Sequence, residues 1–157
     1  MNNNQAIKIL FVCTGNVCRS PMAAAIFAKK AKEAGFEDVM LSDSAGTSDA
    51  HEGEPCDARA VLTCRRRDVQ LAGHRARQIE ASDFEKFDLI LAMDWEVLTE
   101  LQQRAPAAMR HKIQLLMRYP GVGVLEPLPG GIVMTLWAFA LNAVAWAFFR
   151  IRDTPAG

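Results

Sequence analysis

Short apolar segments alternate with helix-forming segments along the first 118 residues of the chain. Four apolar runs have the length of buried strands, and they cover residues 6–13, 39–46, 87–93 and 112–117. Helices are predicted at residues 22–35, 57–67 and 95–104, and Asp83 is expected to cap a short turn before the third strand. Strands that alternate with helices at this spacing predict an α/β fold, with a parallel sheet and helices on both of its faces.

The pattern changes abruptly after the fourth strand. Residues 119–131 have the composition of a loop rich in Gly and Pro, and residues 132–149 are almost entirely apolar. A membrane span needs about 17–25 such residues, but insertion of residues 132–149 would export Arg150 and Arg152 against the positive-inside preference. Membrane insertion is therefore the less favoured interpretation. The others are a divergent C-terminal helix packed on the sheet, and a shifted reading frame near residues 120–126.

The size and charge of the chain narrow the class of protein. A chain of 157 residues, half of them hydrophobic, has the size of one domain, here residues 1–157 with residues 132–157 as an atypical apolar tail. Eighteen basic residues balance eighteen acidic ones, which argues against a nucleic-acid partner bound through bulk charge. The start of the chain lacks the long apolar region of a signal peptide, so a cytoplasmic location is expected.

Four cysteines, at positions 13, 18, 56 and 64, are expected to be free or reactive rather than paired in structural disulfides. Their spacing lacks the CxxC pairs of a zinc site, so no metal site is predicted. Cys56 and Cys64 are interpreted as structural or incidental. The run CRRR at residues 64–67 is interpreted as a solvated helix end that favours the helix dipole, and not as a binding patch.

Residues 11–21, FVCTGNVCRSP, contain the candidate chemistry. Cys13, five further residues and Arg19 form a CX5R loop between a predicted strand and a predicted helix. The backbone N–H groups of such a loop and the helix N-terminus form an anion site, and the same field favours the thiolate form of a cysteine. Arg19 can hold two phosphate oxygens, which a lysine cannot do. Gly15 permits a tight turn, and Ser20 is placed to donate a hydrogen bond to the Cys13 thiolate.

The stretch VCTGNVCRSPMA resembles the low-molecular-weight protein tyrosine phosphatase family. The similarity continues in DSAGTSDAHEGEPCDARA, in HRARQIEASDFEKFDLILAMD and in KIQLL, and it covers about residues 6–118. The resemblance implies a four-stranded parallel sheet flanked by helices, with the CX5R loop after the first strand. It also implies a phosphomonoester hydrolase that acts on phosphotyrosine without a cofactor.

The resemblance further assigns roles to individual residues. Cys13 would attack phosphorus and form a phosphocysteine, which water then hydrolyses, while Arg19 and the loop amides bind the phosphate oxygens. The implied phosphate-binding positions are Thr14, Gly15, Asn16, Val17 and Cys18. Asn16, Ser44 and His74 match positions that brace the loop by hydrogen bonds. Cys18 matches a cysteine that in some members forms a reversible disulfide with the nucleophile.

The family also uses an aspartate as general acid, in an Asp-Pro-Tyr-Tyr-Gly motif on a late loop. This chain has EPLPGG at residues 126–131, so Glu126 replaces the aspartate while Leu128 and Pro129 replace the two tyrosines. Glu126 is the candidate acid with a side chain one methylene longer, and loss of a general acid costs about 10²–10⁴ in rate. Ala50 stands where members often have an aromatic residue. The aromatic wall of the substrate site is therefore thinner than the family pattern.

The leading hypothesis is a cytoplasmic, cysteine-dependent protein-tyrosine phosphatase whose substrate is a phosphotyrosine-containing protein or a small aryl phosphate. An arsenate reductase of the same fold is an alternative, but it needs resolving thiols, and Cys56 and Cys64 do not occupy the positions for them. A third hypothesis is a phosphate-binding or interaction module with impaired catalysis, because the late-loop motif is altered.

Overall fold

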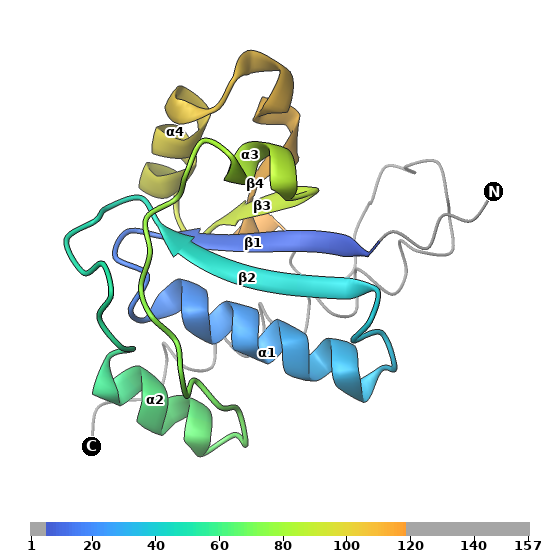
Figure 1. The fold of residues 1–157 in the computed structure, drawn as a ribbon, viewed down its shortest axis with the longest axis vertical. Helices are drawn as coiled ribbons and strands as arrows, with labels where there is room; N and C mark the ends of the chain where they lie inside the picture. The colour runs from blue at the N-terminus through green and yellow to red at the C-terminus, as the bar shows by residue number, and fades with distance from the viewer. Residues whose placement is uncertain (1–5, 119–157) are drawn as a thin grey trace.

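The computed structural model describes residues 6–118 of the chain. Its main elements follow the predicted alternation (Figure 1): β1 Ile7–Cys13, α1 Arg19–Glu33, β2 Met40–Gly46, α2 Ala58–Arg65, α3 Asp83–Lys86, β3 Leu89–Ala92, α4 Trp95–Arg104 and β4 Ile113–Leu115. Two 3-10 helices, η1 Ala107–Lys112 and η2 Leu116–Arg118, flank β4. The predicted α/β fold with a four-stranded sheet is confirmed.

The sheet has the strand order β2-β1-β3-β4, and each pair of neighbouring strands is parallel. β1 is therefore an inner strand, with β2 along one side and β3 along the other. Cys13 pairs with Gly46 at the end of β2, and Val12 pairs with Ala92 at the end of β3. Because parallel strands end at the same edge, the loop after Cys13 begins where three strands finish. Ligands of such sheets bind at this edge.

Helices cover both faces of the sheet, with α1 and α2 on one face and α3 and α4 on the other (Figure 1). Alternate residues of β1 belong to the two cores: Ile9, Phe11 and Cys13 pack on the side of α1, whereas Leu10 and Val12 pack on the side of α4. Burial on both faces explains why this strand is apolar without interruption from Ile9 onward, after the exposed Lys8. It also directs the Cys13 side chain to the face that α1 covers.

Two details of the local structure differ from the prediction. α1 begins at Arg19 rather than at residue 22, so the last residue of the CX5R motif belongs to the first turn of the helix. The prediction that Asp83 caps a turn is wrong, because Asp83 is the first residue of α3. Its buried carboxylate accepts hydrogen bonds from the Glu80 backbone N–H and from Arg77 Nη1, each at 2.8 Å. A buried carboxylate needs such partners, and Asp83 finds them in the segment before the helix rather than in the turn that follows.

The tail at residues 132–157 lies outside the described residues, so its predicted atypical character and the single-domain organisation of residues 1–157 stay predictions. Membrane insertion of residues 132–149 is untested for the same reason. None of the helices within residues 6–118 is long and apolar enough to cross a membrane.

Candidate active site

The CX5R loop, residues 13–19, connects the end of β1 to the first turn of α1. Cys13 is only 3 % exposed, and its Sγ lies 3.0 Å from Ser20 Oγ. The backbone N–H of Asn16 donates to the same sulfur at 3.3 Å. Two groups that can each donate a hydrogen bond to a thiolate therefore hold Cys13 Sγ.

Asn16 is completely buried and joins the loop to three other segments. Its Nδ2 donates to Ser20 Oγ and to Ser44 Oγ, each at 2.9 Å. Its Oδ1 accepts from the backbone N–H of Arg77 at 3.0 Å. Its carbonyl accepts from His74 Nε2 at 2.7 Å, which assigns the proton to that ring nitrogen because a carbonyl can only accept. The φ of Asn16 is 53°, a left-handed conformation that Asn adopts more readily than most residues.

Ser20 connects the loop cysteine to β2. Its Oγ lies 3.0 Å from Cys13 Sγ and 3.1 Å from the carbonyl oxygen of Ala45. A hydroxyl has one proton, so Ser20 can donate to only one of these two acceptors at a time. When Cys13 is a thiol, its S–H donates to Ser20, and the hydroxyl proton serves Ala45. When Cys13 is a thiolate, the hydroxyl proton turns to the sulfur.

Two glycines allow close packing of the loop backbone. A Cβ on Gly15 would lie 2.9 Å from Cδ2 of His51, and a Cβ on Gly46 would lie 2.6 Å from the carbonyl oxygen of Thr14. An alanine at either position would therefore displace its neighbour. His51 lies against the loop at this point, and its Nδ1 is 2.8 Å from a carboxylate oxygen of Glu54.

Arg19 has its guanidinium held by two groups. Nη1 donates to a carboxylate oxygen of Asp94, and Nη2 donates to Thr14 Oγ1 at 3.3 Å. The other carboxylate oxygen of Asp94 accepts from the Val97 backbone N–H at 2.8 Å and so caps α4. Burial acts to raise the pKa of Asp94, but the hydrogen bonds from Val97 and Arg19 outweigh it and hold that pKa below its ordinary value. A charged Asp94 thus fixes one edge of the guanidinium and leaves other N–H groups for an oxyanion.

An open cavity of about 310 Å³ lies over the CX5R loop. The loop itself lines it, together with Ser48, Ala50 and His51. A thiol, a guanidinium and a helix N-terminus that meet at one cavity suit a tetrahedral oxyanion. Among residues 6–118, no group of three His, Cys, Asp or Glu side chains is placed to hold a metal ion.

The predicted site residues within the described part of the chain meet at this end of the sheet. The loop and the first turn of α1 contain Cys13, Thr14, Gly15, Asn16, Val17, Cys18, Arg19 and Ser20. Ser44 and His74 contact the loop through Asn16. Glu126 lies outside the described residues. The catalytic and bracing roles of all these residues stay predictions.

Three residues of the site were not singled out in the sequence. Asp94 directly follows a predicted strand, and the rule that ligands bind at the carboxyl ends of parallel strands could have found it. Arg77 lies in an irregular segment, and its ion pair with Asp43 at 2.9 Å joins distant parts of the chain without a local signal. His51 lies in a loop whose path follows only from the folded structure.

The other thiols lie in surroundings that favour the neutral form. Burial, followed by the charge of Asp57, raises the pKa of Cys18. Burial, followed by the neighbouring Cys64, raises the pKa of Cys56 to about 11. All four cysteines are free, so a reversible disulfide between Cys13 and Cys18 stays a prediction. Cys56 is a neutral, poorly nucleophilic thiol at physiological pH.

The fold and the loop together define a class of protein, the cysteine-dependent phosphatases with a CX5R loop on an α/β sheet. The family model described as low molecular weight phosphotyrosine protein phosphatase matches residues 8–134. The chain belongs to this family. The match extends beyond the resemblance noted over residues 6–118, and it includes Glu126.

Individual relatives agree with the family model. The low molecular weight phosphotyrosine protein phosphatase of Schizosaccharomyces pombe is 39% identical over 130 residues, which span 80% of this chain and 83% of the relative. A protein tyrosine phosphatase structure from Entamoeba histolytica has a TM-score of 0.74 at 31% identity, with 94% of this chain and 98% of that chain covered. A Drosophila arginine phosphatase has a TM-score of 0.70 at 30% identity, with 96% and 100% covered. These relatives are named phosphatases, so the arsenate reductase alternative gains no support from them.

Proposed function

We propose that the chain hydrolyses phosphate monoesters of phenols, above all phosphotyrosine in proteins, through a phosphocysteine on Cys13. The observation that carries the proposal is the geometry at Cys13 Sγ, which lies 3.0 Å from Ser20 Oγ and 3.3 Å from the Asn16 backbone nitrogen. Membership of the phosphotyrosine phosphatase family supports the same reaction. The chemistry needs no cofactor, because Cys13 supplies the nucleophile and the loop supplies the stabilising charge.

In the first step, the Cys13 thiolate attacks phosphorus, so an S–P bond forms while the bond from phosphorus to the phenol oxygen breaks. Ser20 stabilises the thiolate beforehand, because its one proton can turn from Ala45 to the sulfur. The amides of residues 14–19 and the free N–H groups of Arg19 bind the phosphate oxygens. A general acid donates a proton to the phenol oxygen, and Glu126 is the proposed acid.

In the second step, water attacks the phosphorus of the phosphocysteine. The S–P bond breaks, the Cys13 thiolate re-forms, and inorganic phosphate leaves. Glu126, which lost its proton in the first step, accepts one from the attacking water. Asn16 and Asp94 act as positioning residues: Asn16 braces the loop through its buried side-chain hydrogen bonds, and Asp94 holds the Arg19 guanidinium. We place this reaction in the cytoplasm, where a reducing environment keeps the four cysteines free.

The test is hydrolysis of p-nitrophenyl phosphate and of phenyl phosphate by the wild type, Cys13→Ser and Glu126→Gln. The wild type should hydrolyse both esters, and Cys13→Ser should lose at least about 10⁴-fold in kcat, as nucleophile variants do. Glu126→Gln should lose about 10²–10⁴-fold with phenyl phosphate and less with p-nitrophenyl phosphate, because the less basic leaving group needs less protonation. Mass spectrometry of acid-quenched wild type should find one phosphoryl group on Cys13.

The same assay separates the alternatives. A wild type that binds inorganic phosphate but hydrolyses neither ester would replace the proposal by a binding or interaction module. Equal activity of Glu126→Gln and wild type on phenyl phosphate would remove Glu126 as the acid. A peptide with phosphoarginine serves as the competing substrate, since a relative is named an arginine phosphatase. A higher kcat/KM for phosphoarginine than for phosphotyrosine would reassign the substrate.

A further inference from the structure

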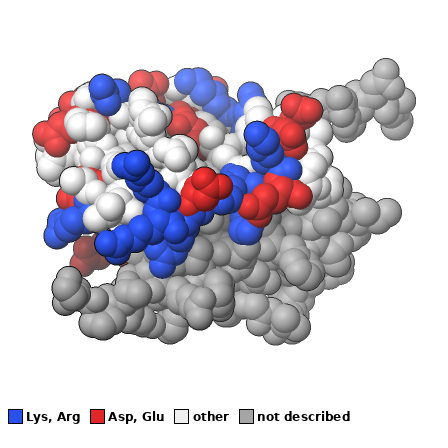
Figure 2. All heavy atoms as spheres, turned by 90° about the horizontal axis from the view of Figure 1, so that it is seen from below, with Lys and Arg blue, Asp and Glu red and all other residues white. Residues whose placement is uncertain are grey.

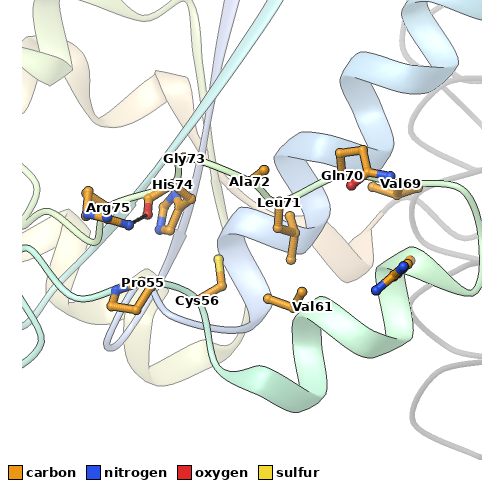
Figure 3. Close-up of a pocket in the computed structure, with 11 residues that line it drawn as sticks. Pro55, Cys56, Val61, Val69, Gln70, Leu71, Ala72, Gly73, His74 and Arg75 are labelled. Atoms are coloured by element: carbon orange, nitrogen blue, oxygen red, sulfur yellow. Dashed lines mark hydrogen bonds between the residues drawn. The ribbon is translucent and has the colours of Figure 1, made fainter.

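A second cavity, about 410 Å³ in volume, lies between α2 and the segment 69–75 (Figure 3). We call it the α2 groove, and it is lined by Pro55, Cys56, Val61, Arg65, Val69, Gln70, Leu71, Ala72, Gly73, His74 and Arg75. Val61 and Leu71 extend toward one another from its two walls (Figure 3). Leu71 is 8 % exposed and Val61 is 40 % exposed, so the groove has an apolar floor that is open to solvent.

The rim of the groove is basic. Arg65 and Arg75 line it, and its lining includes no Asp or Glu. Within residues 6–118 neither arginine forms an ion pair, whereas the neighbouring Arg59 is paired with Asp57 at 3.1 Å. Figure 2 views the molecule from the side on which α2 lies in Figure 1, and Lys and Arg side chains gather there. The groove therefore offers positive charge that the described part of the protein does not neutralise.

One wall of the groove also offers backbone groups. In the described part of the chain, the backbone N–H groups of Gln70, Ala72 and Gly73 donate no hydrogen bond. Gly73 has a φ of +83°, a conformation that favours glycine, and the chain turns at this point before it reaches His74. Such N–H groups can donate hydrogen bonds to the carbonyl oxygens of a bound peptide.

Two contacts connect the groove to the CX5R loop. His74 lines the groove, and its Nε2 donates to the Asn16 carbonyl at 2.7 Å. Asp57 follows the groove residue Cys56, and its backbone N–H donates to the Val17 carbonyl at 2.8 Å. The two cavities share no lining residue, so the groove is a separate site directly beside the loop.

We propose that the α2 groove binds an acidic segment of the phosphoprotein substrate while the phosphotyrosine occupies the CX5R cavity. This proposal rests on the proposed function. Charge complementarity identifies the occupant: unpaired arginines and an apolar floor suit a peptide that combines carboxylate and apolar side chains. In the sequence, the run CRRR at residues 64–67 has the composition of a solvated helix end. In the structure, Arg65 of that run lines the groove, and the proposal gives it a role in binding.

The kinetic test compares two phosphotyrosine peptides, one flanked by alternating Glu and Leu and the other by alternating Gln and Leu. The wild type should have a kcat/KM about tenfold higher for the acidic peptide, through a lower KM, and salt should reduce the preference. Arg65→Gln and Arg75→Gln should each reduce the preference for the acidic peptide about threefold. Both variants should leave p-nitrophenyl phosphate hydrolysis unchanged. Arg104→Gln, which removes an exposed arginine of α4 that pairs with Glu100, is the control for net charge and should retain the preference.

A binding test keeps the groove separate from catalysis. The unphosphorylated Glu-Leu peptide, labelled with fluorescein, should bind the wild type by fluorescence anisotropy, more tightly than its Gln-Leu counterpart. Val61→Trp, which fills the groove without changing its charge, should weaken binding at least about tenfold. Failure of p-nitrophenyl phosphate hydrolysis would reject the proposed function, and this binding test would still report on the groove.

Three results would overturn the groove proposal. The first is equal binding of the Glu-Leu and Gln-Leu peptides. The second is equal loss of preference in Arg65→Gln and in Arg104→Gln, which would show that net charge rather than the groove is responsible. The third is a folded Val61→Trp variant with unchanged peptide binding, which would show that the peptide binds elsewhere.

Discussion

The CX5R loop and the α2 groove contain the same kinds of side chain in opposite settings. In the loop, Asn16 is completely buried, its amide makes three side-chain hydrogen bonds, and Arg19 is held by Asp94. In the groove, Gln70 and Arg65 are exposed, and Arg65 has no ion pair within residues 6–118. The loop thus has its donors fixed before any ligand arrives, as catalysis requires. Within residues 6–118, no hydrogen bond or ion pair is formed by the side chains of Arg65 and Gln70, which suits ligands that are recognised by charge rather than by one fixed shape.

The largest effect should come from exchanging one arginine in each region for lysine. Arg19→Lys should reduce kcat/KM for p-nitrophenyl phosphate about 10²–10³-fold, because an ammonium cannot contact Asp94 and two phosphate oxygens with the same planar geometry. Arg65→Lys should leave this value unchanged, since an exposed charge needs no fixed geometry. Steady-state kinetics of the two variants checks the pair. An Arg19→Lys variant within about threefold of wild type would contradict the claim that the loop depends on fixed geometry.

The next largest effect should come from removing one side-chain amide in each region, Asn16 in the loop and Gln70 in the groove. Asn16→Ala should lower the free energy of unfolding by about 2–3 kcal/mol, because it leaves buried partners such as Ser44 Oγ and the Arg77 N–H without their hydrogen bonds. Gln70→Ala should change it by less than about 0.5 kcal/mol, since this amide is exposed. Urea denaturation of both variants measures the difference. Equal stability of the two variants would show that the buried network does not stabilise the loop.

A smaller effect is expected at the partner of Arg19. Asp94→Asn retains an oxygen for the Val97 N–H but removes the charge that holds the guanidinium. It should reduce kcat about tenfold with little change in KM, because Asp94 positions Arg19 and does not touch the substrate. The low pKa of Asp94 keeps this carboxylate charged down to mildly acidic pH, so the difference between variant and wild type should persist at pH 5. A rise in KM with unchanged kcat would instead indicate a role in binding.

The sequence predicts the loop better than the groove, and the reason is the distance along the chain between interacting residues. Cys13, Arg19 and Ser20 lie within one short segment, and the strand before it is recognisable as an apolar run. Their chemistry could therefore be inferred from spacing and from residue type. The strand order and the contact of Arg19 with Asp94 join residues that are far apart, and no local pattern records such a pair.

The α2 groove shows the same limit more strongly. Arg65 lies on α2, and Arg75 lies in a segment without regular structure, so their meeting depends on how that segment packs against the helix. From the sequence, the arginines after Cys64 had the composition of an ordinary helix end. Asp83 is a different case, since its partners Arg77 and Glu80 are close in sequence, but the helix begins at Asp83 itself rather than after it.

The last effect comes from the thiol of the groove, and it is absent at neutral pH. Cys56 is 8 % exposed, and within residues 6–118 no hydrogen bond holds its Sγ, in contrast to Cys13. Burial, followed by Cys64, raises its pKa to about 11 from the ordinary value of 9.0. Between these two values the unfolded chain has released the proton and the folded chain has kept it. The stabilising contribution is therefore fully present below pH 9 and is lost as the pH rises to about 11.

The free energy of unfolding of the wild type should accordingly decline across this window, by at most about 1.4 kcal/mol for each pH unit from this one group. The free energy of unfolding of Cys56→Ala should decline less steeply between pH 9 and 11, because alanine has no proton to release. This holds even if the variant is less stable than the wild type at neutral pH. Urea denaturation at pH 8, 9, 10 and 11 measures both slopes. Parallel curves for the variant and the wild type would mean that folding does not raise the pKa of Cys56, which would contradict the protected setting of this thiol.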